Sequence, residues 1–138
     1  MLTFPYNVYA EEAGFHELVS YPKEDIVQLS GNIMARRDFL QTNSDLAERF
    51  VRSTIQGLVY VRNNRSGTIP IIARTLKVQE HLAAKVYDFA LPGMTANGTI
   101  TQELQEKAMR PFVKRPGDKK ALMEKLFNYS LAQRFSKN

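Results

Sequence analysis

The segment from Asn43 to Asn63 constrains the fold most, because it has the pattern of one long amphipathic helix. Asn43 suits the N-cap position, and Asp45 and Glu48 place negative charge near the positive end of the helix dipole. Apolar residues recur along the segment in steps of three and four, at Leu46, Phe50, Ile55, Leu58, Val59 and Val61. We therefore expect a helix here with one face buried in a core.

Shorter helices are expected around it, each delimited by a proline, a glycine or a capping residue. The stretch from Pro5 to Ala13 suits a short helix, with Gly14 at the position of a left-handed C-terminal cap. Pro70 is tolerable only in the first turn of a helix that begins around Thr68. Further helical stretches are expected at 37–41, at 79–89, after a capping box formed by Thr99 and Gln102, and after Asp118, with Ser130 capping a final turn.

Three short segments near the N-terminus are expected to be extended. They are rich in apolar and β-branched residues and lie between turn signals: His16 to Tyr21, Ile26 to Leu29, and Ile33 to Ala35. With the helices they predict an α+β fold that is predominantly helical. This fold would have about five to six helices and a short β element of roughly two or three strands near the N-terminus.

Length and composition indicate a folded globular chain. The 138 residues match the size of one domain, so we expect a single domain over residues 1–138. A hydrophobic share of 43% against 24% charged residues differs from the composition of disordered chains. The sequence contains no cysteine, which excludes disulfides, thiolate catalysis and cysteine-ligated zinc.

No pattern of catalytic or metal-binding residues stands out in the sequence. Neither His16 nor His81 is followed four residues later by a carboxylate or a second histidine, as in helical metal-ligand pairs. The sequence has no Gly-x-Ser-x-Gly motif and no glycine-rich phosphate loop. We therefore expect no enzymatic activity, no metal and no cofactor, and a function in binding or assembly.

The charge of +5 raises the question of an anionic partner. Much of the excess lies in the C-terminal third, where the basic residues have the spacing of solvated helix faces. No aromatic residues interleave with them in a base-stacking pattern, so nucleic acid is not expected as a partner. A helical interaction module that docks an acidic protein or nucleic acid through this basic third is kept as an alternative function.

The N-terminal residues do not resemble an export signal. Met1 to Pro5 contain no basic region followed by an apolar stretch, and no later segment has the roughly 18 to 20 apolar residues that span a bilayer. We expect no membrane insertion and, for the chain as encoded, a cytoplasmic location.

Three passages of the sequence resemble a family of known proteins. They are PYNVYAEEAGFHEL at 5–18, GNIMARRDFL at 31–40 with the following segment 43–57, and AKVYDF at 84–89 with Asn97-Gly98. In order and spacing they resemble the C-terminal portion of ABC-importer solute-binding proteins of the nitrate, sulfonate and thiamine-precursor type. The resemblance covers nearly all of this chain but only part of the family's two-lobed fold, so it implies a partial type II periplasmic-binding-protein fold.

The resemblance also implies a ligand site and a partner. Tyr6, Asn7, Ser30, Gly31 and Asn32 match regions that approach the ligand in this family, so they are the expected ligand-binding residues. Loss of the first lobe would expose apolar surface, and self-association as a homodimer would bury it. We expect a non-enzymatic, stand-alone protein derived from a solute-binding protein, with a small organic molecule as candidate ligand. The other alternative is a fragment of a full-length solute-binding protein, which would place it in the periplasm.

Overall fold

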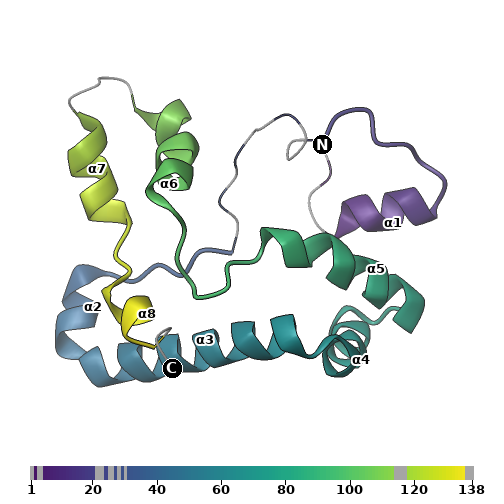
Figure 1. Ribbon diagram of the computed structural model, residues 1–138, viewed down its shortest axis with the longest axis horizontal. Helices are drawn as coiled ribbons and strands as arrows, with labels where there is room; N and C mark the ends of the chain where they lie inside the picture. Colours follow the sequence, from purple (N-terminus) through teal and green to yellow (C-terminus); the bar gives the residue numbers. More distant parts are fainter. Residues whose placement is uncertain are drawn as a thin grey trace. The chain divides into compact units, whose positions relative to one another are not determined.

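The computed structural model describes residues 2, 5–20, 24, 27, 29, 31–113 and 118–135. All regular secondary structure within these residues is helical (Figure 1). The elements are α1 (Tyr6–Glu12), α2 (Arg37–Thr42), α3 (Ser44–Asn63), α4 (Arg65–Leu76), α5 (Glu80–Ala90), the 3₁₀ turn η1 (Leu91–Gly93), α6 (Gln102–Met109), the 3₁₀ turn η2 (Arg110–Phe112), α7 (Asp118–Leu126) and α8 (Ser130–Phe135).

The predicted β element is wrong. Residues 15–20 and 31–36 have no regular secondary structure, and Tyr21, Ile26, Gln28 and Ser30 lie outside the described residues. Leu18 is 95% exposed and Met34 is 89% exposed, so these apolar side chains are not buried on a sheet face. A short strand is stable only when a neighbouring strand and a packed face support it, and the described chain supplies neither here.

The fold class therefore changes from α+β to all-helical. The eight α-helices of the described part also exceed the five to six that were expected. The partial type II periplasmic-binding-protein fold, which needs a sheet, does not fit this structure.

The chain forms two compact units, which are described separately below. The first unit contains residues 1–20 and 56–96, and the second contains residues 21–55 and 97–138. Helix α3 contributes residues to both units, because the boundary falls between Ile55 and Gln56. The expectation of a single domain stays a prediction.

In the first unit, α4 and α5 pack against each other and α1 lies against α5 (Figure 1). The α5 residues Ala83, Val86 and Tyr87 are buried, as is Val8 of α1. The Tyr87 hydroxyl donates a hydrogen bond of 2.7 Å to the carbonyl of Val61, so the buried phenol has a partner on α3. The predicted helix at 79–89 is thus confirmed, with its apolar side in the core.

Helix α4 begins earlier than expected. The side chain of Asn64 accepts a hydrogen bond of 2.8 Å from the Gly67 amide, so Asn64 is the N-cap and Arg65 the first helical residue. Pro70 is therefore the sixth residue of the helix and not part of its first turn. Because proline has no N–H, it cannot donate the helical hydrogen bond to the Ser66 carbonyl.

The end of α1 confirms the predicted glycine cap. Gly14 has φ +86°, its amide donates to the Glu11 carbonyl, and the Phe15 amide donates to the Ala10 carbonyl, both at 3.0 Å. This pair of hydrogen bonds is the Schellman motif, which satisfies the last carbonyls of a helix.

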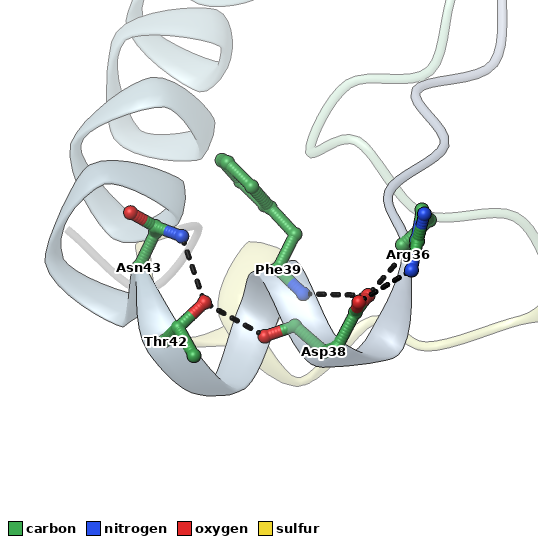
Figure 2. A network of polar contacts seen from close by, with 5 residues as sticks. All are labelled: Arg36, Asp38, Phe39, Thr42 and Asn43. Carbon is green, nitrogen blue, oxygen red and sulfur yellow. Dashed lines mark hydrogen bonds and ion pairs between the residues drawn. The ribbon is translucent and has the colours of Figure 1, made fainter.

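A network of polar contacts holds the start of α2 and its junction with α3 (Figure 2). The Arg36 guanidinium donates to both carboxylate oxygens of Asp38, at 3.0 and 2.5 Å, and the Phe39 amide donates to Asp38 Oδ1 at 2.9 Å. Thr42 Oγ1 donates to the Asp38 carbonyl and accepts from Asn43 Nδ2, both at 2.9 Å. The Arg36 hydrogen bonds, followed by the Phe39 amide, lower the pKa of Asp38.

In the second unit, the N-terminal part of α3 packs where α8 and the turn before α6 meet. Ile55 and Ala132 are buried, and Gly98 lies so close that a Cβ on it would be 2.5 Å from Ile55 Cδ1. Gly98 has φ +74°, so both its backbone conformation and its surroundings favour glycine.

The predicted capping box of α6 is wrong. Thr101, and not Thr99, caps this helix by accepting a hydrogen bond of 3.3 Å from the Leu104 amide. Thr99 instead donates through its amide and its hydroxyl to Asn97 Oδ1, at 3.0 and 2.8 Å. The Asn97 side chain closes the turn before the helix, as such side chains commonly do.

The single apolar face expected for α3 is also wrong in part. Ile55 is buried and Leu58 and Val61 are half-buried, but Leu46, Phe50 and Val59 are exposed. At 100° per residue, Leu46 lies about 180° around the helix from Ile55. Helix α3 therefore carries apolar side chains on more than one side.

Replacement of Gly98 by alanine tests the tight packing in the second unit. We expect Gly98→Ala to lower the free energy of unfolding by about 2 to 4 kcal/mol, since it adds overpacking against Ile55 to the cost of a positive φ. The matched control is Gly14→Ala, which has a similar φ but whose Cβ would meet nothing within 4 Å. It should cost only about 1 kcal/mol. Urea unfolding measures both values, and equal losses would contradict the packing described for Gly98.

Candidate functional site

The structure places four of the five predicted ligand-binding residues, in two stretches of the chain. Tyr6 and Asn7 open α1 in the first unit, while Gly31 and Asn32 precede α2 in the second unit. Ser30 lies outside the described residues. A common site for these residues stays a prediction.

Tyr6 and Asn7 differ in their surroundings. The Tyr6 ring is exposed and contacts the Tyr9 ring edge to face, with 5.9 Å between the centroids. Asn7 is half-buried, and its Oδ1 atom is buried without a hydrogen-bond partner in the described part of the chain. A buried acceptor of this kind is available to a donor group.

Gly31 and Asn32 form a local turn. Gly31 has φ +72°, and the Asn32 side-chain amide donates a hydrogen bond of 2.9 Å to the Leu29 carbonyl. Both residues are exposed. A turn role accounts for these two residues without a ligand.

Charged residues bind α1 to α5 in the first unit. Glu12 of α1 contacts Nε2 of His81 at 3.2 Å and pairs with Nζ of Lys85. Hydrogen bonding from Lys85 is the largest effect on the pKa of Glu12. Together with the positive charge of Lys85 and the contact with His81, it outweighs the opposing effect of burial and lowers that pKa. A carboxylate held by two bases is a structural contact and a poor proton acceptor.

A second ion pair joins α4 to α5. The guanidinium of Arg65 donates to both carboxylate oxygens of Asp88, at 3.0 and 2.8 Å, and lies 5.8 Å from the centroid of the Tyr87 ring. The hydrogen bonds lower the pKa of Asp88 and raise that of Arg65. This two-pronged geometry fixes the orientation of the two helices.

In the second unit, Glu48 links α3 to α8. It accepts from Arg134 at 3.2 Å and lies 3.5 Å from Arg52 one turn along α3. The guanidinium groups of Arg52 and Arg134 also lie 4.7 and 5.7 Å from the centroid of the Phe135 ring. Together these charged groups and the Phe135 ring hold α8 against α3.

One hollow of the second unit lies on α3. It is an open depression of about 500 Å³ beside Asp45, Glu48, Arg49 and Arg52. A neighbouring depression of about 350 Å³ extends from Thr42 to Leu46 and shares Asp45 and Arg49. Ligand pockets are usually enclosed and mainly apolar, and these surfaces are open and charged.

The surface that stands out is apolar and lies along α3. Leu46 is 49% exposed, Phe50 is 55% exposed and Tyr60 is 45% exposed. The sequence pattern missed this surface because all apolar residues of the helix were assigned to one face. A helical projection, in which Leu46 and Phe50 lie well away from Ile55, would have separated them.

The described residues show no metal centre and no membrane span. In the described ranges, no group of three or more His, Cys, Asp or Glu side chains could hold a metal ion. No helix found there is both long and apolar enough to cross a membrane. Comparison with family models, curated proteins and solved structures found no match for this chain.

Glu12→Gln tests the charged contact between α1 and α5. We expect a small loss of stability at pH 7, because the carboxylate with the lowered pKa is ionised and paired there. The contribution of the Glu12 carboxylate to the free energy of unfolding should be present above the ordinary glutamate pKa of roughly 4.3. It should vanish as the pH falls through the lower pKa of Glu12 in the folded state. Thermal unfolding of the wild type and the variant from pH 7 to pH 3 measures the difference.

The control for this experiment is Glu11→Gln. It removes the same charge one residue away, at a position turned about 100° around the helix. A similar loss of stability from Glu11→Gln would show that total charge matters and the contact with His81 and Lys85 does not.

Proposed function

We propose that this chain is a non-enzymatic binding protein that acts as a homodimer and is derived from a solute-binding protein. The proposal combines the resemblance of the three sequence passages with the exposed apolar surface of the helices. A small organic molecule is its candidate ligand. The fold of intact solute-binding proteins is not part of the proposal.

The exposed apolar surface is the observation that carries the proposal. Among the described residues, eighteen large apolar side chains are exposed, whereas nine apolar residues are buried. Apolar surface of this extent in a folded protein usually marks a site of association. Several of the exposed side chains lie on helices: Leu46, Phe50, Val59, Tyr60, Ile71, Phe89, Leu104 and Leu126.

Partner binding through the basic C-terminal third is the weaker alternative. Several basic residues there already pair with carboxylates of the same chain: Lys107 with Glu103 at 3.6 Å, Lys119 with Glu106 at 2.5 Å, and Arg134 with Glu48 at 3.2 Å. These contacts neutralise part of the charge that an acidic partner would need.

The oligomeric state tests the association. Static light scattering at 200 µM protein should give a mass near twice the 15.8 kDa of one chain. A mass of one chain at this concentration would contradict the homodimer.

Ligand binding requires a separate test. We expect a thermal-shift screen of small sulfonates, pyrimidines, amines and aromatic acids to contain at least one compound that raises the melting temperature by several degrees. A ligand that binds only the folded state stabilises it in proportion to the logarithm of its concentration. If no compound of these classes raises the melting temperature, the proposed ligand class is wrong, and the homodimer is unaffected.

A further inference from the structure

The sequence contains one Asn-Gly pair, formed by Asn97 and Gly98 in the turn before α6. Asparagine is a chemically labile residue, because its side-chain amide can lose ammonia when the next backbone nitrogen attacks it. Glycine as the next residue has no Cβ to obstruct that attack. Asn97 is exposed, so water and hydroxide have access to its side chain.

The side chain of Asn97 is folded forward over the Gly98 peptide. Its Oδ1 atom accepts hydrogen bonds from the Thr99 amide at 3.0 Å and from the Thr99 hydroxyl at 2.8 Å. Because a backbone N–H only donates, the side-chain atom that faces it is the carbonyl oxygen. The hydrogen bond to the Thr99 amide closes a ring that contains both Cγ of Asn97 and the Gly98 nitrogen, which keeps these two atoms from swinging apart.

The two hydrogen bonds from Thr99 also polarise the Asn97 carbonyl. When a nitrogen adds to Cγ, negative charge develops on Oδ1. Donors that are already in place at such an oxygen stabilise the tetrahedral intermediate of acyl transfer. Both Thr99 donors are in place in the folded chain, so the turn lowers the barrier to attack at Cγ.

We propose that Asn97 is a site of deamidation in the folded protein, with the Gly98 nitrogen as nucleophile and Thr99 as oxyanion donor. The Gly98 nitrogen gives up its proton to hydroxide and forms a bond to Cγ of Asn97. The bond from Cγ to Nδ2 then breaks, and Nδ2 leaves as ammonia after it takes a proton from water. The product is a cyclic succinimide at positions 97 and 98. This modification does not depend on the function proposed above.

Water then opens the succinimide ring in one of two ways. Cleavage of the bond from Cγ to the Gly98 nitrogen gives aspartate at position 97. Cleavage of the bond from the backbone carbonyl carbon to the same nitrogen gives isoaspartate. In sum, one water molecule is consumed and one ammonia molecule is released.

The isoaspartate product does not fit the packing of the second unit. Its backbone runs through Cβ and Cγ, so it carries one extra methylene directly before Gly98. Gly98 has no room to shift freely, since a Cβ on it would lie 2.5 Å from Ile55 Cδ1 and 3.7 Å from Ala132 Cβ. Aspartate at position 97 keeps the ordinary backbone and an acceptor for both Thr99 donors. Isoaspartate should therefore loosen the core around Ile55, whereas aspartate should leave it intact.

The same unit contains a matched control site at Asn128. Its Oδ1 atom accepts from the Ser130 amide at 3.1 Å and from the Ser130 hydroxyl at 2.8 Å, as Asn97 accepts from Thr99. Asn128 is also exposed. The nucleophile there belongs to Tyr129, whose Cβ and ring obstruct the approach. The two sites thus share their hydrogen bonds and differ in the residue that attacks.

Peptide mapping by mass spectrometry compares the two sites in one experiment. The full chain is kept at about pH 8 and 37 °C, where circular dichroism verifies that it is folded, and is then digested with trypsin. The peptides 86–107 and 126–134 contain Asn97 and Asn128 separately, and an aliquot taken at zero time gives the background of the digestion. We expect the gain of about 1 Da to appear at least about tenfold faster at Asn97. Equal rates, or an Asn97 that stays unmodified, would overturn the proposal.

Thr99→Val tests the oxyanion donor, because valine keeps the shape of threonine and lacks the hydroxyl. We expect deamidation of Asn97 to slow several-fold and that of Asn128 to be unchanged. If the hydroxyl only restrained the Asn97 side chain, its removal would make the reaction faster. An unchanged or faster rate at Asn97 would overturn the role assigned to Thr99.

The Asn97→Asp variant tests the consequence for the fold. It has the same atoms and charge as the isoaspartate form, which ion-exchange chromatography separates from aged protein, but it lacks the extra backbone methylene. We expect the isoaspartate form to melt several degrees below Asn97→Asp, and Asn97→Asp to melt close to the wild type. Equal melting temperatures of the isoaspartate form and Asn97→Asp would overturn the packing consequence.

Discussion

Contacts to the long helix α3 occur in both units of the described structure. Its C-terminal part supplies the carbonyl of Val61 to the buried hydroxyl of Tyr87, which anchors α5 in the first unit. Its N-terminal part supplies Ile55, which covers Gly98 and Ala132, and Glu48, which holds Arg134 of α8. Each unit therefore includes part of one long helix, while the closest helix packing in the first unit is between α4 and α5. The other helices are short, and short helices depend on tertiary packing for their stability.

The ion pairs contribute orientation more than stability. Glu12, Asp88 and Glu106 each have their pKa lowered mainly by one basic partner, but their side chains remain partly exposed to solvent. Exposed pairs contribute little to the free energy of folding. Apolar burial has to supply most of it, and the described chain leaves much apolar surface uncovered. This imbalance is the physical reason for assigning the protein a function in association.

Periodicity over many residues predicted the helical elements well. The long helix at 43–63 and the helix at 79–89 were predicted because several turns of apolar spacing agree, and the α1 cap was predicted because Gly14 is the residue type that a left-handed end needs. The strands around Leu18 and Met34 failed because three or four apolar residues in a row do not show whether a partner strand exists. The start of α4 and the cap of α6 were misplaced because adjacent polar residues compete for the same role. In the structure, Asn64 is the N-cap of α4 and Thr101 is the N-cap of α6.

The candidate site was predicted from resemblance and not from periodicity, and it stays a prediction. Tyr6, Asn7, Gly31 and Asn32 were chosen by resemblance, and the structure gives a buried, unpaired acceptor to only one of them, Asn7. The exposed face of α3 was hidden because a list of apolar positions does not say which of them the folded chain covers. That information depends on tertiary packing around Ile55 and Gly98, which no local pattern contains.

Nuclear magnetic resonance tests the central claim, that a second copy of the chain covers exposed apolar side chains of the helices, most directly. A mixture of isotope-labelled and unlabelled protein at millimolar concentration should show intermolecular Overhauser effects from exposed apolar side chains such as Leu46 or Phe50. Such signals are the result that the homodimer predicts. A spectrum with no intermolecular signal from any exposed apolar side chain would contradict the account.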